Sequence, residues 1–187
     1  CRENKVALIE NFMCGFHPQH QKVLSLIKEG FIGEPFTFKS YFGFPPLDKS
    51  NFRYKKEMGG GALSDTGAYT VFMSRKLFGE EPLAVTCSLI NDSEGGVDVQ
   101  GTAQLEFPNN KNGLVAFSFN SVYQNSYSLW GTAGLIKVNR AYSVPESMNC
   151  LIEVLQNKNY KESVSEVYVP AANQFQLIFQ NFCEVLL

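Results

Sequence analysis

Hydrophobic positions near the start of the chain change their spacing twice, and each change predicts a different element. Val6 to Ile9 form a short continuous apolar run, which is typical of a strand buried on both faces of a parallel sheet. Pro18 opens a stretch in which apolar positions recur every three or four residues until Gly30, so we expect a helix with one buried face. From Phe36 to Phe44 large apolar and polar side chains alternate, which indicates a strand.

The rest of the chain is dominated by strand patterns. The polar segment from Leu47 to Met58 has no clear period and is interpreted as a loop. Strand patterns then run from Leu83 to Val169, separated by clusters of Asn, Asp, Gly and Pro that are typical of turns. They predict an antiparallel meander of six strands, and the strand from Phe36 brings the sheet to about seven.

The expected fold class is therefore α+β, with an open, mainly antiparallel sheet and helices on one face. The first strand and helix look like the tail of a βαβ unit whose earlier part is absent. The uncovered face of the sheet needs cover, by water or by a partner. Phe117 and Phe119, or Val97 and Val99, are expected to make that face apolar.

One stretch, Met58 to Gly79, combines a helix pattern with possible chemistry. Three glycines precede a run of helix formers, and cations followed by Gly79 end it, so a helix of about four turns is expected. Asp65 and Tyr69 are four residues apart and share a face near the start of this helix. They form a possible proton-handling pair. The alternative is that Tyr69 packs in the core with its hydroxyl bonded to a backbone group.

The three glycines, Gly59 to Gly61, have two interpretations. Free N–H groups at a helix start can bind an anion. However, the pattern lacks the Lys-Ser/Thr of a phosphate-binding loop and is not GxGxxG after a buried strand. The glycines more simply permit close approach of backbone or positive φ. Arg53 and the lysines beside it are candidates to meet a phosphate or carboxylate, although solvated surface charge is the commoner role.

Composition and charge exclude several classes. The 187 residues carry a net charge of −2 with scattered cations, so nucleic acid is not an expected partner. Five cysteines lie far apart without a CxxC pair, which favours a reducing, cytoplasmic setting over disulfides or a thiolate zinc site. His17 and His20 lack partners at metal-ligand spacing, so no metal is expected. No apolar run is long enough to span a membrane, and the N-terminus does not look like a signal peptide.

Several short motifs together resemble one family, that of glucose-fructose oxidoreductase, inositol dehydrogenase and MocA. The motifs are Glu10-Asn11-Phe12-Met13, His17-Pro18-Gln19-His20, Gly30-Phe31-Ile32-Gly33-Glu34, Phe52-Arg53-Tyr54 and the stretch from Gly59 to Tyr69. The resemblance covers nearly the whole chain, including Gly131 to Arg140 and Asn173-Gln174-Phe175. The sequence is most similar to the branch of nucleotide-sugar 3-ketoreductases and dihydrodiol dehydrogenases.

The resemblance implies a protein of two lobes. An N-terminal Rossmann domain would bind NAD or NADP, and a largely antiparallel α/β domain would shape the substrate site and dimerise through its open sheet. Residues 1–14 then correspond to the end of the Rossmann domain, including its last strand, and residues 15–187 to the substrate-binding and dimerisation domain. The glycine-rich dinucleotide fingerprint and the Glu-Lys-Pro segment with the family's catalytic lysine do not occur in this sequence. The missing initiator Met also suggests a fragment, one that would be inactive alone.

The resemblance also assigns roles to residues. The family motif DxGx(H/Y) is matched by Asp65, Gly67 and Tyr69. Reduction of a ketone by hydride leaves an alkoxide that needs a proton donor, and Tyr69 can be that donor. Asp65 would orient the substrate or the lysine. Candidate substrate contacts are His17, Asn11 and Arg53, and Glu10 and Asn11 are weaker candidates for cofactor contacts.

The leading hypothesis is the substrate-binding and catalytic lobe of an NAD(P)-dependent oxidoreductase that acts on a sugar or nucleotide-sugar ketone or alcohol. The alternative is a non-catalytic dimerisation or sugar-sensing module that retains the fold. The expected partners are a small-molecule sugar and a second copy of the chain, and neither nucleic acid nor a membrane. The identity of the sugar, the choice between NAD and NADP and the direction of reaction depend on residues outside these motifs.

Overall fold

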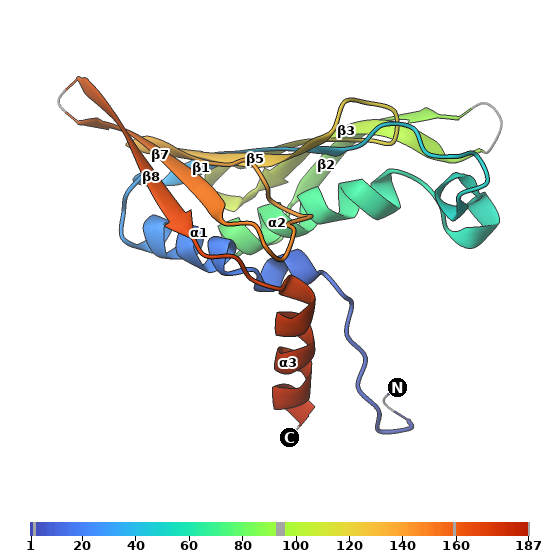
Figure 1. Ribbon diagram of the computed structural model, residues 1–187. Coiled ribbons are helices and arrows are strands. Elements are labelled where there is room, and N and C mark those ends of the chain that lie inside the picture. The colour runs from blue at the N-terminus through green and yellow to red at the C-terminus, as the bar shows by residue number, and fades with distance from the viewer. Residues whose placement is uncertain (2, 93–95, 159, 187) are drawn as a thin grey trace.

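The chain folds as one large sheet with helices against one face (Figure 1). The computed structural model describes residues 1, 3–92, 96–158 and 160–186. The described residues form an eight-stranded sheet in the order β2-β3-β4-β1-β5-β6-β7-β8. The strands are β1 (Pro35–Gly43), β2 (Ala84–Asn91), β3 (Asp98–Phe107), β4 (Lys111–Ser118), β5 (Gln124–Gly131), β6 (Gly134–Val138), β7 (Cys150–Lys158) and β8 (Lys161–Val169). This confirms the α+β class and the open, mainly antiparallel sheet.

The position of β1 differs from the expected meander. β1 lies between β4 and β5, parallel to β4 and antiparallel to β5. The later strands therefore form two separate antiparallel groups, β2 to β4 and β5 to β8, on either side of β1. The count is also one strand higher than the seven expected. Hydrophobic periodicity identifies strands but not their neighbours, because every strand offers the same backbone donors and acceptors on its edges.

Two helices cover one face of the sheet, α1 (Pro18–Lys28) and α2 (Ala68–Phe78). α1 begins as expected, with Pro18 in its first turn and the His17 ring accepting a hydrogen bond from the Gln19 N–H, and Gly30 follows its end with φ of 78°. The sheet and the two helices share one core. Its fully buried members include Val23, Ile32, Phe38, Met73, Leu129, Ile136 and Ile152.

The third helix, α3 (Gln174–Leu186), packs by its first turns and then projects away from the sheet (Figure 1). Ile178 is buried, whereas Phe179 is 62% exposed. In the described part of the chain, no helix is long and apolar enough to cross a membrane.

The N-terminal segment does not form the expected strand. Val6 to Ile9 are assigned no secondary structure, and Leu8 is 82% exposed. A strand needs a neighbouring strand to pair its backbone groups, and none of the described strands lies beside this segment.

The uncovered face of the sheet is built from other residues than expected. Phe117 and Phe119 are buried in a small cluster with Tyr54 and Ala62, Val99 packs partly buried against this cluster, and Val97 is buried as well. The predicted apolar outer face at these positions is wrong. Phe117 lies on the face of the sheet that the turn before α2 (Leu63–Gly67) covers, with its ring against Gly67, and Phe119 packs against Phe44 and Tyr54 of the segment after β1. The strand register instead places Thr102, Ala116, Tyr41 and Ser126 in one row across the outer face, and Thr37, Trp130, Leu135, Leu155 and Val164 in another.

A buried polar cluster joins α1 to the sheet and predicts a pH dependence of stability. The His20 Nδ1 lies 2.9 Å from the Tyr127 hydroxyl and its Nε2 lies 2.8 Å from the Ala141 carbonyl oxygen. Since a carbonyl only accepts, Nε2 carries the proton and Nδ1 accepts from Tyr127. Burial lowers the pKa of His20 to about 3.

We expect the free energy of unfolding to fall as the pH is lowered from about 6.5 towards 3. The folded pKa lies below the ordinary value near 6.5, so the unfolded chain binds a proton that the folded chain excludes. The slope approaches about 1.4 kcal/mol per pH unit for this residue alone. Urea unfolding at several pH values measures it, and the imidazole NMR signal of the folded protein should remain neutral at pH 5. Protonation of His20 in the folded state near pH 6 would contradict the assignment.

Candidate active site

The helix that carries Asp65 and Tyr69 begins with a π-helical turn. Leu63–Gly67 form this turn and continue directly into α2, so the helix starts later than Met58, which belongs to a separate 3-10 turn (Lys56–Met58). The Gly67 N–H donates to the Ala62 carbonyl oxygen at 2.8 Å, five residues back. Gly67 has no side chain, and a Cβ there would lie 3.1 Å from the Phe117 ring on β4. The turn therefore packs closely on the sheet, and such turns are frequent at functional sites.

The three glycines before this turn are required by the backbone conformation rather than by a bound anion. Gly59 and Gly61 have φ values of 74° and 128°, and a Cβ on Gly60 would overlap the Arg53 carbonyl group. The interpretation of these glycines as a device for positive φ and close approach is confirmed.

The N–H groups at this helix start already have protein partners. The Gly61 N–H donates to the Arg53 carbonyl oxygen at 3.0 Å, and the Ala62 N–H donates to the Asp98 carbonyl oxygen at 2.8 Å. The Leu63 N–H donates to the Asp98 carboxylate at 2.6 Å. Asp98 thus occupies the position that a bound anion would take, so the loop is not a phosphate cradle.

Arg53 and Asp65 form an ion pair beside the helix start. The Arg53 Nε donates to the Asp65 Oδ2, and both side chains are roughly 30% exposed. Arg53 belongs to a 3-10 turn (Phe52–Tyr54) that the Asn51 side chain caps. The loop after β1 thus brings Arg53 to the helix that carries Asp65.

Tyr69 lies half-buried in a pocket of aromatic rings. Its ring makes edge contacts with Phe12, Phe42 and Tyr142, with centroid distances of 5.4 to 6.0 Å. The only hydrogen-bond partner of its hydroxyl in the described part of the chain is the Met13 sulfur, a weak acceptor at 3.5 Å. The predicted alternative, a hydroxyl bonded to a backbone group, is therefore not what the structure shows.

The charges around Tyr69 identify its neighbours. Burial raises the pKa of its hydroxyl, and Cys14, Asp65 and Glu10 raise it further, whereas the Arg53 guanidinium opposes them. Asp65 therefore acts on Tyr69 through space, without a hydrogen bond between them. The hydroxyl is protonated at neutral pH, which is the state that a proton donor needs.

The remaining predicted site residues, Glu10, Asn11 and His17, differ in their exposure to solvent. Glu10 and Asn11 lie exposed in the N-terminal segment, with Glu10 close enough to influence Tyr69. His17 is fully buried, its Nδ1 accepts from the Gln19 N–H, and its Nε2 has no protein partner. The structure therefore gathers Tyr69, Asp65, Arg53 and Glu10, whereas His17 makes no hydrogen bond or ion pair with any of the four in the described part of the chain.

Some residues of this site carried no signal in the sequence. Phe12 and Met13 were part of a motif, but nothing in their spacing indicated contact with Tyr69. Asp98, which caps the helix start, lies 35 residues from Leu63 along the chain. Local spacing cannot reveal a partner at that separation, and only the pairing of strands brings the two together.

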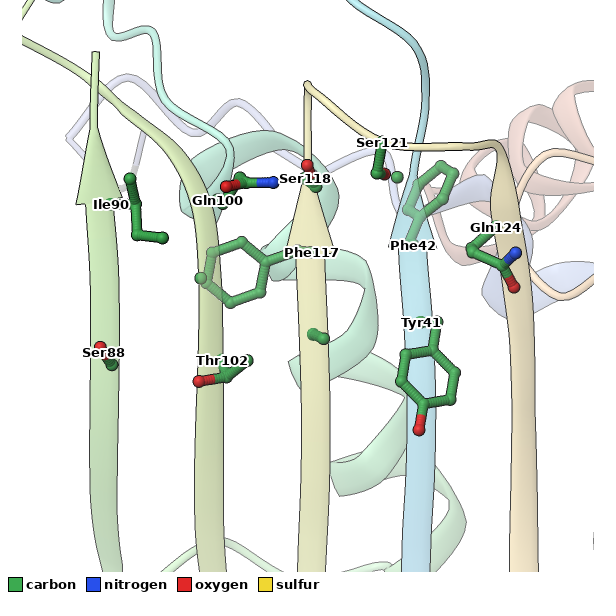
Figure 2. A pocket seen from close by; sticks show the side chains of 13 residues that line it. Tyr41, Phe42, Ser88, Ile90, Gln100, Thr102, Phe117, Ser118, Ser121 and Gln124 are labelled. Carbon is green, nitrogen blue, oxygen red and sulfur yellow. The ribbon is translucent and has the colours of Figure 1, made fainter. Parts of the chain in front are cut away.

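A separate groove lies on the outer face of the sheet (Figure 2). It has a volume of about 370 Å³, and side chains from β1 to β5, among them Tyr41, Ile90, Gln100 and Thr102, line it. No charged residue is among its lining residues. The helices lie behind the strands in this view, so the groove opens on the face opposite α2. It offers no carboxylate, imidazole or amine to work beside the Tyr41 hydroxyl and is not the candidate active site.

Curated proteins from several organisms are similar to this chain in sequence. A dTDP-3,4-didehydro-2,6-dideoxy-alpha-D-glucose 3-reductase from Saccharopolyspora spinosa is 34% identical over 92% of this chain and 51% of its own length. A trans-1,2-dihydrobenzene-1,2-diol dehydrogenase from Xenopus laevis is 30% identical over 73% of this chain and 41% of its own length. The chain thus spans about half the length of the curated relatives it matches.

Among solved structures, KijD10 is similar throughout. It is described as a 3-ketoreductase from Actinomadura kijaniata, in complex with NADP and TDP-benzene. It matches with a TM-score of 0.89 and 29% identity, over 98% of this chain and 55% of KijD10. The family model described as the GFO/IDH/MocA C-terminal domain matches residues 20–137. Since that match covers more than half of the 187 residues, the chain belongs to the GFO/IDH/MocA family and carries its C-terminal domain.

Proposed function

We propose that this chain is the substrate-binding and catalytic lobe of an NAD(P)-dependent oxidoreductase that acts on a sugar or nucleotide-sugar ketone or alcohol. The observation that carries the proposal is the position of the Tyr69 hydroxyl, which is half-buried, protonated and without a strong partner, beside the Arg53–Asp65 ion pair. The relatives support the substrate class, since several are reductases of dTDP-sugars.

In this proposal Tyr69 handles the proton of the reaction. A bound nicotinamide cofactor would be the source of the hydride, or its acceptor in the reverse direction. When the carbonyl carbon gains hydride, the π electron pair of the C=O bond moves to the oxygen. The Tyr69 hydroxyl gives its proton to that oxygen, and water then reprotonates the phenolate. In the reverse direction the phenolate removes the proton of the alcohol.

Asp65 and Arg53 position the substrate and adjust Tyr69. The Asp65 carboxylate can accept a hydrogen bond from a sugar hydroxyl one helical turn from Tyr69. Arg53 opposes the carboxylates that raise the pKa of Tyr69. A lysine, which the resemblance implies outside this chain, would lower that pKa further and stabilise the developing alkoxide. Asn11 remains a proposed substrate contact, and His17 can join only if its buried Nε2 becomes accessible.

The cofactor would be held mainly outside the described residues. Asp98 and backbone carbonyls take the N–H groups of the glycine loop, so this loop cannot cradle a pyrophosphate. Glu10 and Asn11 are exposed beside Tyr69 and would face the nicotinamide end. We propose, accordingly, that residues 1–14 complete a nucleotide-binding domain and that residues 15–187 form the substrate domain.

A fluorescence titration of the full-length protein with NADH and NADPH tests the class of function. We expect saturable binding of one or both, followed by oxidation of the bound cofactor when a carbonyl sugar is added. An intact, folded protein that binds neither cofactor would instead favour a non-catalytic dimerisation or sugar-sensing module.

The open face of the sheet is proposed to pair with a second copy of the chain. It exposes Tyr41 by 49%, Trp130 by 51% and Val164 by 66%, a combination that large buried interfaces favour. One row across it runs from Lys39 through Ser128 and Lys137 to Glu153 and Glu166. Cations therefore lie at its centre and carboxylates at one edge. A two-fold axis along the strands, between β5 and β6, would set Lys39 of one copy against Glu153 of the other.

Charge reversal is expected to weaken this dimer. Replacing Glu153 by Lys places a like charge opposite Lys39, which should raise the dimer dissociation constant about tenfold or more. Adding Lys39→Glu should restore association, because the pair is re-formed with opposite sign. Sedimentation equilibrium of the full-length protein at low and high salt measures both effects. A wild-type protein that is monomeric at high concentration would contradict the dimer.

A further inference from the structure

Arg53 is held in place more firmly than a surface arginine. Its Nε donates to the Asp65 carboxylate, and its carbonyl oxygen accepts from the Gly61 N–H. Its guanidinium also lies over the rings of Phe52 and Phe44, with centroid distances of 4.8 and 5.9 Å. A long side chain that is fixed in the free protein loses less conformational entropy when it binds a ligand.

One edge of the fixed guanidinium has no hydrogen-bond acceptor among the described residues. In the described part of the chain, Arg53 donates a side-chain hydrogen bond only through Nε, so Nη1 and Nη2 have no protein acceptor. The side chain is 29% exposed, so part of it remains accessible to a ligand. Two parallel N–H groups on a planar cation match two oxygens of a phosphate or carboxylate.

The place of Arg53 in the site indicates which group it meets. It is near enough to Tyr69 to influence the hydroxyl. In a nucleotide-sugar the diphosphate is attached at the anomeric carbon, one bond from the ring. A sugar whose carbonyl oxygen lies at Tyr69 therefore carries its phosphate about one ring width away. Lys55 and Lys56 follow Arg53 in the loop and add positive charge, which offsets the carboxylates of Asp65 and Glu10.

We propose that the Nη1/Nη2 edge of Arg53 is the subsite for a phosphate group of the substrate. The inference rests on the proposed function and deepens it, because it makes a phosphate-bearing sugar the preferred substrate over a neutral one. Asp65 contributes by holding Nε, which turns the free edge towards the substrate. Arg53 is thereby a specificity-determining residue as well as the partner of Asp65.

Binding of nucleoside diphosphates without cofactor tests the proposal on the full-length protein. Calorimetric titrations with dTDP, UDP and GDP measure the phosphate arm, and glucuronate provides a carboxylate arm. Arg53→Lys keeps the charge beside Asp65 but loses the planar fork, so we expect the affinity for the best-bound diphosphate to fall about tenfold or more. Arg75→Lys is the matched control, because it makes the same change at an arginine that pairs with another carboxylate, Glu81, and should change affinity less than about threefold.

A second measurement uses the wild-type protein and does not depend on the folding of a variant. Phenylglyoxal labels accessible arginines, and mass spectrometry resolves Arg53 from Arg75 and Arg140. The bound diphosphate should slow labelling of Arg53 and leave Arg75 unchanged.

Three results would overturn the proposal. The first is equal diphosphate affinity of Arg53→Lys and wild type, and the second is labelling of Arg53 that the diphosphate does not slow. The third is binding of glucuronate, but of none of the three diphosphates, in an Arg53-dependent manner. Failure of the oxidoreductase proposal is distinguishable, since it would appear as absent nicotinamide binding whatever the diphosphate result.

Discussion

Replacing Tyr69 by Phe in the full-length protein is expected to lower the rate of hydride transfer about 10²-fold or more. The change removes one oxygen atom, and with it the proton donor for the oxygen that gains negative charge. The ring contacts with Phe12, Phe42 and Tyr142 remain, because the phenyl ring has the same shape. The hydroxyl has only the Met13 sulfur as a described partner, so its loss should hardly change stability. The effect should therefore appear in turnover alone.

Single-turnover oxidation of bound NADPH, followed by its absorbance, measures this rate apart from product release. Tyr160→Phe is a suitable control, since this side chain is fully exposed and far from the ring pocket of Tyr69 in the sequence. The control should keep the wild-type rate. Turnover by Tyr69→Phe at the wild-type rate would remove Tyr69 from the mechanism and leave Asp65 or a water molecule as the proton source.

Replacing Gly61 by Ala is expected to lower the free energy of unfolding by more than about 2 kcal/mol. The backbone at Gly61 has a φ of 128°, a conformation that residues with a Cβ rarely adopt. The added Cβ would also overlap the Asp98 carboxylate, which bonds the Leu63 N–H at the helix start. Backbone strain at residue 61 and loss of the Asp98 cap should therefore both lower the free energy of unfolding.

Gly59→Ala separates these two causes. Gly59 also has a positive φ, 74°, but a Cβ there would meet nothing within 4 Å. It should cost only the left-handed backbone penalty, about 1 kcal/mol. Urea unfolding of both variants beside wild type gives the two values. A Gly61→Ala variant as stable as Gly59→Ala would show that Asp98 moves aside at little cost.

The sequence was informative wherever one segment determines its own conformation. The alternation from Phe36 to Phe44 predicted β1 with its buried Phe38 and Phe42, and the spacing after Pro18 predicted α1. The resemblance of motifs predicted the family, which the family model confirms. Asp65, Tyr69 and Arg53 were named from the same motifs, and the structure brings the three together, although their roles stay predictions.

The predictions that were wrong share a physical cause. Each concerns a segment whose conformation depends on residues far away in the sequence. Val6 to Ile9 read as a buried strand, but a strand forms only beside another strand. Phe117 and Phe119 were predicted on the outer face, but they pack against the turn before α2 and the segment after β1, which come from another part of the chain. The π turn at Leu63–Gly67 likewise leaves no local signature, since the spacing of apolar residues barely differs from that of an α-helix.

The central place of β1 determines an order of events during synthesis. β1 leaves the ribosome before both strands that pair with it, because β4 and β5 follow it in the chain. Until then a strand with four phenylalanines within or beside it has two open edges. The two antiparallel groups can form separately, but they remain two sheets until β1 joins them. Assembly of this domain is therefore a late, non-local step, and the nascent chain is most exposed to aggregation just before β1 is enclosed.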